Sequence, residues 1–345
     1  MNRRQLLAAG ALAATPLGAR AQPMPTPAPP PSPPRGQLPP VPLVETPALP
    51  MTIVAEGLRF PEGPVAAKDG SLYFVQIDAK QVCRLTPAGK VEVLAEPGGG
   101  PNGLAAGPDG HIWIANNGGR FTFVQRDGFT MSGPPPAGFT GGGRIQRMDL
   151  RTGKVETVFD SIDGKPLIAP DDLVFDRAGG LWVTEFGLGQ GTGALYYAAP
   201  GGKTLTLARG GMNAPNGIGV SPDGKLLHVS MGTSLYAFDI AGPGKLAATT
   251  YPDGRQAGLY QGSFADSLRL QADGKVCVCS LFRPGGVSVI DRQGGVEFLG
   301  FPDRMVCSLA FGGRDMRDAW LMLSGLGKIA KVRWPAPGQT PAFRI

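Results

Sequence analysis

Several features are scarce in this chain of 345 residues, and each scarcity excludes a class of protein. Charged residues make up only 17% of the sequence, and the Lys and Arg residues are scattered, so the basic stripe typical of a nucleic-acid-binding protein is missing. No uninterrupted apolar run reaches the roughly 18 residues that span a bilayer. We therefore expect no nucleic-acid partner, and no transmembrane span after removal of the N-terminal leader.

Histidine and cysteine are also rare. The two histidines, His111 and His228, have no G-x-S-x-G nucleophile motif to accompany them, so we expect structural roles for both rather than serine-hydrolase chemistry. No CxxC pair exists, which disfavours a structural zinc site. Cys277 and Cys279 are two apart on one predicted strand and therefore share a face, so we expect small buried residues rather than a disulfide.

Glycine and proline, in contrast, are abundant. The 53 glycines and 35 prolines punctuate short apolar runs, and Pro-Asp-Gly turns stand at residues 108–110 and 222–224. Such turns are typical of β-hairpins, in which glycine accepts a positive φ. The composition therefore favours many short strands over a helical bundle.

A short motif recurs six times, and each copy precedes an apolar run, a Gly-containing turn and a second apolar run. The copies begin Pro61-Glu62-Gly63, Pro101-Asn102-Gly103, Pro170-Asp171-Asp172, Pro215-Asn216-Gly217, Ala265-Asp266-Ser267 and Val306-Cys307-Ser308. Four of the five spacings lie between 40 and 50 residues, the length of one four-stranded blade. The repeat predicts an all-β fold, a six-bladed β-propeller with four-stranded blades around a central channel.

Two further features concern the ring itself. The one long spacing contains residues 116–143, rich in Gly and Pro, which we interpret as an insertion that forms a lid or rim loop. A propeller must also join its last blade to its first. We predict that residues 52–58 supply the outer strand of the last blade, beside residues 328–333.

The N-terminal region reads as two segments that precede the propeller at residues 51–345. Residues 1–21 resemble an export signal, with Arg3-Arg4 before an apolar stretch and an A-x-A cleavage site ending at Ala21. The paired arginines indicate the twin-arginine route and a periplasmic or secreted protein; an ordinary secretory signal or an uncleaved anchor are the alternatives. Residues 22–50 are Pro-rich and read as a disordered tether.

Equivalent positions of propeller blades face one axis, so the second residues of the motif copies should meet. Five of them bear oxygen: Glu62, Asn102, Asp171, Asn216 and Asp266. Converging carboxylates would repel one another without a cation, and such hard oxygen ligands suit calcium best, with magnesium or manganese as alternatives. The competing interpretation is that each Asp or Asn merely forms a turn before a strand.

Other residues are placed near the same mouth by the repeat. Cys307 holds the sixth axial position, where we expect a small channel residue rather than a nucleophile. Second strands return the chain to this mouth, and their ends supply further pocket candidates: Asn116, Asn117, Glu185, Phe186, Met231 and Arg283. Of these, Asn116, Glu185 and Arg283 join Asn102 as our candidates for substrate binding.

These motifs resemble those of the senescence marker protein, gluconolactonase and luciferin-regenerating enzyme family, over roughly residues 51–335. The resemblance rests on Phe60-Pro61-Glu62-Gly63-Pro64, Pro101-Asn102-Gly103-Leu104, Pro215-Asn216-Gly217-Ile218, Ser221-Pro222-Asp223-Gly224 and Phe311-Gly312-Gly313. It implies a six-bladed propeller with one divalent cation in its axial channel. Calcium is the expected ion, with magnesium, manganese or zinc as alternatives.

The resemblance also implies roles for single residues. The family's metal ligands fall on Glu62, Asn216 and Asp266, and the third-motif residue, here Asp171, contacts metal or substrate. Asp266 is the expected catalytic base, with Asp171 second, and Asn102 would orient the substrate. The chain departs from the family at Ala169, where some sugar-lactone hydrolases have Arg, and around Asp266, where relatives commonly have Pro-Asp-Gly.

Taken together, these features lead us to expect a monomeric, exported enzyme that hydrolyses a small-molecule lactone or related ester with a bound cation. The alternative is a non-catalytic, calcium-stabilised propeller that serves as a ligand-binding or interaction scaffold, because fold alone does not fix function.

Overall fold

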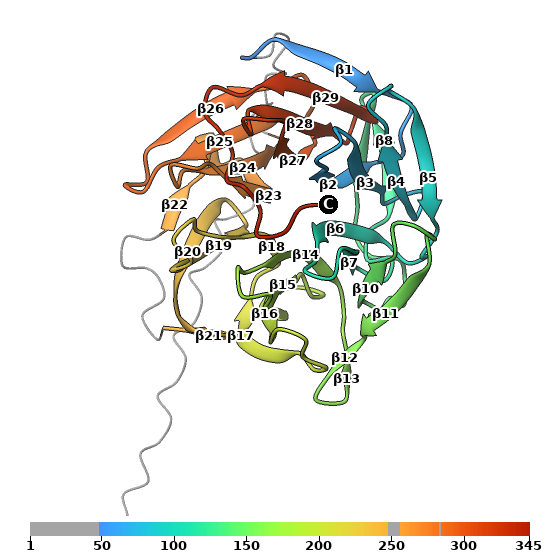
Figure 1. Ribbon diagram of the computed structural model, residues 1–345, viewed down its shortest axis with the longest axis vertical. Helices are drawn as coiled ribbons and strands as arrows, with labels where there is room; N and C mark the ends of the chain where they lie inside the picture. The colour runs from blue at the N-terminus through green and yellow to red at the C-terminus, as the bar shows by residue number, and fades with distance from the viewer. Residues whose placement is uncertain (1–47, 248–255, 283) are drawn as a thin grey trace, which may run out of the picture. The chain divides into compact units, whose positions relative to one another are not determined.

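The computed structural model describes residues 48–247, 256–282 and 284–345, and six four- or five-stranded β-sheets of this part are arranged around one axis (Figure 1). The arrangement confirms the predicted six-bladed propeller. Among the described residues, the helical content is one short 3₁₀ helix, η1 (Tyr260–Gly262), and no helix is long and apolar enough to cross a membrane.

Each blade is an antiparallel sheet whose strands follow one another outward from the axis. Blade 1 contains β2 (Pro61–Ala66), β3 (Leu72–Gln76), β4 (Gln81–Leu85) and β5 (Val91–Ala95). Blade 2 contains β6 (Pro101–Ala106), β7 (Ile112–Asn116), β10 (Arg144–Met148) and β11 (Val155–Phe159). Blade 3 contains β14 (Pro170–Phe175), β15 (Leu181–Glu185), β16 (Gly193–Ala198) and β17 (Thr206–Met212).

The second half of the chain repeats this plan. Blade 4 contains β18 (Pro215–Val220), β19 (Leu226–Met231), β20 (Ser234–Gly242), β21 (Lys245–Leu246) and β22 (Gln256–Gly258), which pairs with β20. Blade 5 contains β23 (Phe264–Leu270), β24 (Val276–Leu281), β25 (Gly286–Ile290) and β26 (Val296–Gly300). Blade 6 contains β27 (Val306–Gly312), β28 (Asp318–Leu323), β29 (Lys328–Arg333) and β1 (Met51–Ala55).

The ring closes through the N-terminal strand, as the sequence predicted. Strand β1 pairs antiparallel with β29, with Met51 opposite Val332 and Thr52 opposite Lys331. Neighbouring inner strands contact one another around the axis, and β27 contacts β2. Buried apolar clusters fill the space between blades; Phe74 of blade 1, for example, packs in one cluster with Trp320 of blade 6. Hydrogen bonds of β1 therefore complete blade 6, and packing holds the last blade to the first.

The region predicted as an insertion contains a hairpin of its own, β8 (Phe123–Arg126) and β9 (Phe129–Ser132). Although it leaves the sheet at blade 2, it reaches blade 6, where Thr130 N donates a hydrogen bond to Gly325 O at 2.8 Å. A second small hairpin, β12 (Ser161–Ile162) and β13 (Lys165–Pro166), follows β11. The β8–β9 hairpin thus lies along the rim of one mouth of the channel.

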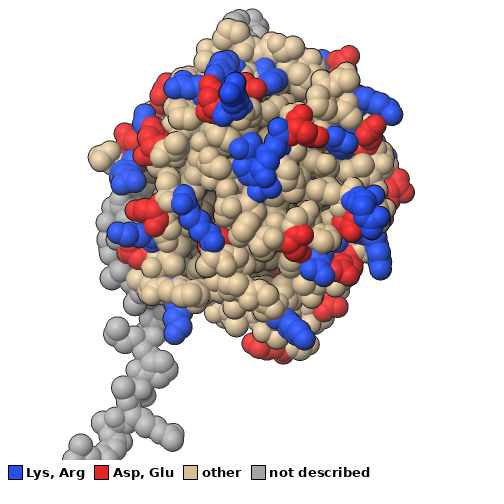
Figure 2. Space-filling view, in the orientation of Figure 1, with Lys and Arg blue, Asp and Glu red and all other residues tan. Residues whose placement is uncertain are grey.

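The C-terminal segment crosses the other mouth, and the marked C-terminus lies over the middle of the ring in Figure 1. Gln339 N donates to Leu270 O at 2.8 Å, and Lys68 N donates to Ile345 O, also at 2.8 Å. On the face shown in Figure 2, the Lys and Arg side chains are interspersed with Asp and Glu side chains. The described residues on that face therefore present a mixed surface charge.

Candidate metal centre and active site

Two cavities lie at opposite ends of the six inner strands. The first residues of five of these strands line a cavity of about 300 Å³, which we call the acidic cavity because Glu62, Asp171 and Asp266 line it. The last residues, such as Ala66 and Phe175, line a second cavity of about 570 Å³, which we call the far cavity. The motif residues therefore belong to one mouth of the channel, and the ends of the same strands belong to the other.

A β-bulge at every copy of the motif interrupts the inner hairpin. In all six blades the register shifts within the motif, for example between Glu62 and Val65 in blade 1 and between Pro101 and Leu104 in blade 2. A bulge bends its strand and re-aims the local side chains. The bulge occurs at the same position of every blade. The motif side chains converge as predicted, because the acidic cavity is lined by Glu62, Asn102, Asp171, Asn216 and Asp266.

Glycine at the third position of the motif allows neighbouring inner strands to approach closely. A Cβ added to Gly63 would lie 2.1 Å from Asn102 O, and one added to Gly217 would lie 2.5 Å from Leu268 N. Gly63 also has a φ of 56°, which side chains rarely adopt. The motif glycine therefore has a packing role, because it lets the backbones that carry the acidic and amide groups meet.

Hydroxyl groups at the ends of the second strands fix the motif backbone of the next blade. Thr184 Oγ1, from blade 3, donates to Asn216 O in blade 4 at 2.6 Å. Ser230 Oγ, from blade 4, donates to Asp266 O in blade 5. Both hydroxyl-bearing residues are fully buried. Buried hydrogen bonds of this kind hold a site in its working geometry.

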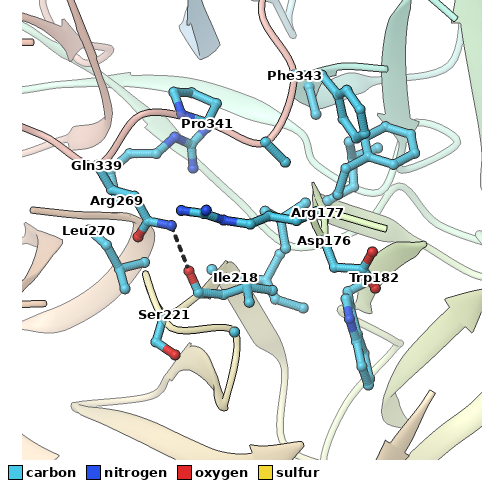
Figure 3. Close-up of a pocket in the computed structure, with 18 of the residues that line it drawn as sticks. Asp176, Arg177, Trp182, Ile218, Ser221, Arg269, Leu270, Gln339, Pro341 and Phe343 are labelled. Atoms are coloured by element: carbon cyan, nitrogen blue, oxygen red, sulfur yellow. Dashed lines mark hydrogen bonds between the residues drawn. The ribbon is translucent and has the colours of Figure 1, made fainter. Parts of the chain in front are cut away.

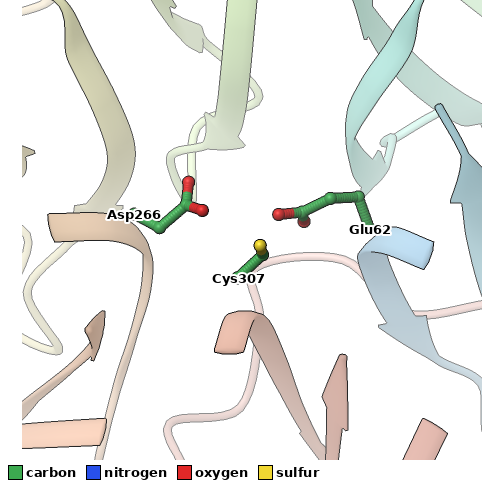
Figure 4. Close-up of side chains that lie close together, drawn as sticks. All are labelled: Glu62, Asp266 and Cys307. Atoms are coloured by element: carbon green, nitrogen blue, oxygen red, sulfur yellow. The ribbon is translucent and has the colours of Figure 1, made fainter. Parts of the chain in front are cut away.

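The side chains of Glu62, Asp266 and Cys307 point toward one another (Figure 4). One oxygen of each carboxylate and the Cys307 sulfur all lie within 4.8 Å of one another. Burial raises the pKa of the Cys307 thiol well above its ordinary value, so the sulfur is protonated and a poor nucleophile. Cys307 is therefore a small neighbour of the acidic pair, as its axial position suggested.

At the acidic cavity the carboxyl groups of Glu62 and Asp171 are buried, and that of Asp266 is half-buried. Burial raises the pKa of Glu62, Asp171 and Asp266, and the charge of Asp266 raises the pKa of both Glu62 and Asp171 further. None of the three forms an ion pair with another described residue. Asp172, the residue after Asp171, differs because it has an ion-pair partner: Arg269 Nη1 lies 3.3 Å from Asp172 Oδ2. Burial raises the pKa of Asp172, and the charge of Arg269 acts in the opposite direction and lowers it. The ring therefore carries excess negative charge when ionised.

The donor set fits a divalent cation. Asn216 Oδ1 is buried and has no hydrogen-bond partner, although buried polar atoms in proteins are nearly always satisfied. With the carboxylate oxygens of Glu62, Asp171 and Asp266 it forms a set of hard oxygen donors, the kind that calcium prefers. Buried carboxylates of like charge must bind either protons or a cation.

The far cavity has a different character. Its lining is mostly apolar, and Gln339 of the C-terminal segment donates from Nε2 to Val220 O at 3.1 Å along its wall (Figure 3). Arg269, which pairs with Asp172, also lines it. Glu62, Asp171 and Asp266 do not line the far cavity, so the acidic cavity is the candidate reaction site.

Some residues that the sequence placed near this mouth are engaged elsewhere. Asn116 Nδ2 donates to Gln146 Oε1 at 2.9 Å, and Glu185 Oε1 accepts from Ala169 N at 2.5 Å. Neither Asn116 nor Glu185 lines the acidic cavity, so their positions do not support the predicted substrate contact. Arg283 lies outside the described residues.

Only one of the remaining pocket candidates lines the acidic cavity. Phe186 lines the acidic cavity, whereas Asn117 and Met231 do not. His228 is buried in blade 4, where burial lowers its pKa to about 4, and it also lies outside this cavity. Cys277 and Cys279 are buried and free, which confirms that they form no disulfide with each other.

Four further phenylalanines line the acidic cavity and escaped the sequence reasoning: Phe60, Phe121, Phe264 and Phe282. Phe60 and Phe264 each stand directly before a motif copy, so an aromatic residue at that position could have predicted a cavity-lining side chain. Phe121 belongs to the insertion, where no repeat phase guides a prediction.

Comparison with known proteins identifies the family of this chain and agrees with its fold. Residues 60–324 match the SMP-30/Gluconolactonase/LRE-like region. A gluconolactonase from Zymomonas mobilis is 25% identical over 325 residues, which cover 82% of this chain and 81% of that protein. A solved gluconolactonase structure from Xanthomonas campestris superimposes with a TM-score of 0.65 at 19% identity, covering 83% of this chain and 90% of the other. The calcium-binding protein regucalcin from Agrobacterium tumefaciens gives a TM-score of 0.65 at 18% identity, covering 85% and 96%. The structural likenesses show the shared propeller, and the match over residues 60–324 shows that the chain belongs to the SMP-30/gluconolactonase/LRE-like family.

Proposed function

We propose that the protein is a divalent-cation-dependent hydrolase that opens a lactone, or cleaves a related ester, at the acidic cavity. The observation that carries this proposal is a set of three carboxyl groups, two buried and one half-buried, that form no ion pair with another described residue and lie beside the unpartnered Asn216 Oδ1. Membership of the family and the names of the relatives, gluconolactonase among them, support a lactone as the substrate.

Glu62, Asn216 and Asp266, with Asp171 beside them, are the residues that would hold one cation. Calcium is our first choice, because the donors are oxygens and because a structural neighbour is described as calcium-binding; magnesium, manganese and zinc are the alternatives. When bound, the cation would supply Lewis-acid stabilisation of the carbonyl oxygen.

Asp266 is the proposed general base. It is partly accessible, whereas Glu62 and Asp171 are each only 3% exposed, so Asp266 exchanges protons with water most readily. Its carboxylate accepts a proton as a water oxygen bonds to the carbonyl carbon; the ring C–O bond then breaks, and the proton passes to the leaving oxygen. Asp171 is the second candidate for this role, and Asn102, which lines the cavity and bonds to Asp171, orients the substrate.

Chelation and reconstitution test the proposal. Purified protein is stripped of metal, and hydrolysis of a lactone panel is followed by proton release before and after single additions of calcium, magnesium, manganese and zinc. We expect activity to vanish on stripping and to return with calcium, and Asp266→Asn to lower kcat by about 10²–10⁴-fold. Turnover that survives stripping would contradict cation dependence, and no turnover under any condition would favour the scaffold alternative.

We also propose that the protein is exported, on the basis of Arg3-Arg4 and the apolar stretch that follows them in the leader. These residues lie outside the described part of the chain. Cell fractionation of the wild type and of the Arg3→Lys, Arg4→Lys double variant tests this proposal. We expect the wild type outside the cytoplasm and the variant retained within it, and equal distributions would contradict the twin-arginine route.

A further inference from the structure

The wall of the acidic cavity is aromatic beyond the ring of acids and amides. Five phenylalanines line it: Phe60, Phe121, Phe186, Phe264 and Phe282. Apart from the five ring residues, only Ser132 and Asn213 bring polar side chains to the lining among the described residues. Asn213 is partly engaged, because its Oδ1 accepts a hydrogen bond from Gly191 N at 2.7 Å. The wall therefore has few groups that could satisfy substrate hydroxyls.

The rings are organised in pairs that flank the mouth. Phe121 and Phe186 meet edge to face with centroids 5.4 Å apart, and Phe264 and Phe282 do so at 6.0 Å. The first pair joins the insertion of blade 2 to blade 3, and the second belongs to blade 5. Edge-to-face pairs of this kind favour fixed ring positions.

A cation supports the first pair from behind. The Arg120 guanidinium carbon lies 5.3 Å from the Phe121 ring centroid and 5.4 Å from that of Phe186. Arg120 is 9% exposed and does not line the cavity, and its Nε donates to Gly187 O at 3.2 Å. The guanidinium thus fixes the rings and is not presented to a substrate.

Two of the wall residues hold an unfavourable backbone conformation. Phe60 has a φ of 56° and Phe282 a φ of 71°, and a bulky residue with positive φ is a genuine outlier. Ala214, which also lines the cavity and precedes the fourth motif as Phe60 precedes the first, has a φ of 53°. Such strain persists where the surrounding structure enforces it, and it gathers at functional sites.

From this wall we propose that the substrate is a lactone with an apolar substituent, aryl or alkyl, and not a polyhydroxylated sugar lactone. This inference rests on the proposed lactone hydrolysis. The carbonyl end of the substrate would lie against the acidic ring, and its apolar part would lie between the phenylalanine pairs. A sugar would bring several hydroxyl groups to a wall where, among the described residues, only Ser132 and Asn213 offer polar side chains, and a buried polar group without a partner is unfavourable.

Lactones that share one ring and differ only in substituents test this inference. We compare kcat/KM for glucono-1,5-lactone, δ-decalactone and δ-phenyl-δ-valerolactone, with unsubstituted δ-valerolactone as the reference, using protein saturated with the cation that supports turnover. We expect the pentyl-substituted δ-decalactone and the phenyl-substituted lactone to exceed the sugar lactone by about 100-fold or more in kcat/KM.

Variants show whether the wall causes the preference. Phe264 is 42% exposed and Phe121 is half-buried, so neither truncation removes a core side chain. In Phe264→Ala and Phe121→Ala, we expect the preference for the phenyl substrate over δ-valerolactone to fall by about 10-fold, mainly through KM. Phe343→Ala is the matched control, because Phe343 lines the far cavity and should leave the ratio at the wild-type value.

The outcomes distinguish failure of the apolar substrate class from failure of the proposed lactone hydrolysis. A sugar lactone hydrolysed as well as or better than the substituted lactones overturns the apolar substrate class and leaves lactone hydrolysis standing. An aryl preference that survives in both phenylalanine variants, with folding verified by circular dichroism, overturns the role of the wall. No turnover of any lactone, δ-valerolactone included, ends both the proposed function and this inference.

Discussion

Asn102 and Asp171 come from neighbouring blades and are joined at the acidic cavity, where Asn102 Nδ2 donates a hydrogen bond to Asp171 Oδ2 at 2.9 Å. The bond fixes one carboxylate oxygen and leaves the other available to a cation or a substrate. An amide in this position thus orients an acid without adding charge to a ring that already carries three carboxyl groups.

Removal of this amide should weaken the site. We predict that Asn102→Ala lowers calcium affinity by about 10–100-fold, the usual effect of losing a group that orients a metal ligand. Isothermal titration calorimetry on stripped protein measures the affinity. Asn213→Ala is the matched control, because Asn213 lines the same cavity but bonds to Gly191 N, and its calcium affinity should stay near that of the wild type. Equal affinities for wild type and Asn102→Ala would contradict this role.

The raised carboxyl pKa values predict how stability depends on pH. Burial raises the pKa of Glu62 and Asp266 in the folded protein, so the folded state binds more protons than the unfolded state above about pH 4. The free energy of unfolding of the metal-free protein should therefore fall as the pH rises from about 4 towards neutrality. Calcium replaces those protons, so its stabilising effect should grow over the same range.

Thermal unfolding of stripped and calcium-saturated protein at about pH 5 and about pH 8 measures this effect. We expect the increase in Tm on adding calcium to be larger at the higher pH. Glu62→Gln removes one of the groups with a raised pKa, so in this variant the increase in Tm on adding calcium should depend less on pH. A calcium effect that is larger at about pH 5 would contradict the assigned direction of the shifts.

The Asp172–Arg269 ion pair predicts a large effect on stability. The Asp172 side chain is 2% exposed and that of Arg269 is 23% exposed, so Arg269→Met would leave a buried carboxylate uncompensated. We expect a loss of about 3–5 kcal/mol in the free energy of unfolding. The double variant Asp172→Asn, Arg269→Met should recover most of that loss.

Urea denaturation of the three proteins measures these differences. Arg333→Ala is the matched control, because Arg333 pairs with Asp315 and Asp318 on the surface, where ion pairs contribute little. If Arg269→Met is as stable as Arg333→Ala, the pair between the two cavities has no structural role.

Ring closure by β1 gives a fourth prediction. Val54 and Ala55 pack against the buried cluster that includes Leu72 and Trp320, and deletion of Met51–Ala55 would also expose the edge of β29. We expect a lower midpoint in guanidinium and concentration-dependent association, since an uncovered edge strand pairs readily with other chains. Thr52→Ala, at an exposed position of the same strand, serves as the control and should unfold near the wild-type midpoint.

The repeat phase accounts for what the sequence predicted well. Because a propeller places equivalent positions on one axis, the motif alone identified five cavity-lining residues, Glu62, Asn102, Asp171, Asn216 and Asp266. The need to close the ring identified the pairing of β1 with β29. Both predictions rest on the geometry of the repeat, which neighbouring side chains do not alter.

Features set by contacts between distant segments were beyond the sequence. Phe282 lines the cavity with a positive φ that residue type does not predict, and the Asp172–Arg269 pair joins residues 97 positions apart. Asn116 and Glu185 end second strands as expected, yet their polar groups bond to nearby backbone and side-chain atoms. Repeat phase gives the place of a residue along a blade, whereas these partners depend on loops that differ from blade to blade.

The most direct measurement is an anomalous-difference map from crystals of stripped protein soaked in calcium. We predict one strong peak inside the acidic cavity, coordinated by oxygens of Glu62, Asn216 and Asp266. A map with no peak there under saturating calcium, or with the ion bound only elsewhere, would contradict the proposed metal centre and the hydrolysis that depends on it.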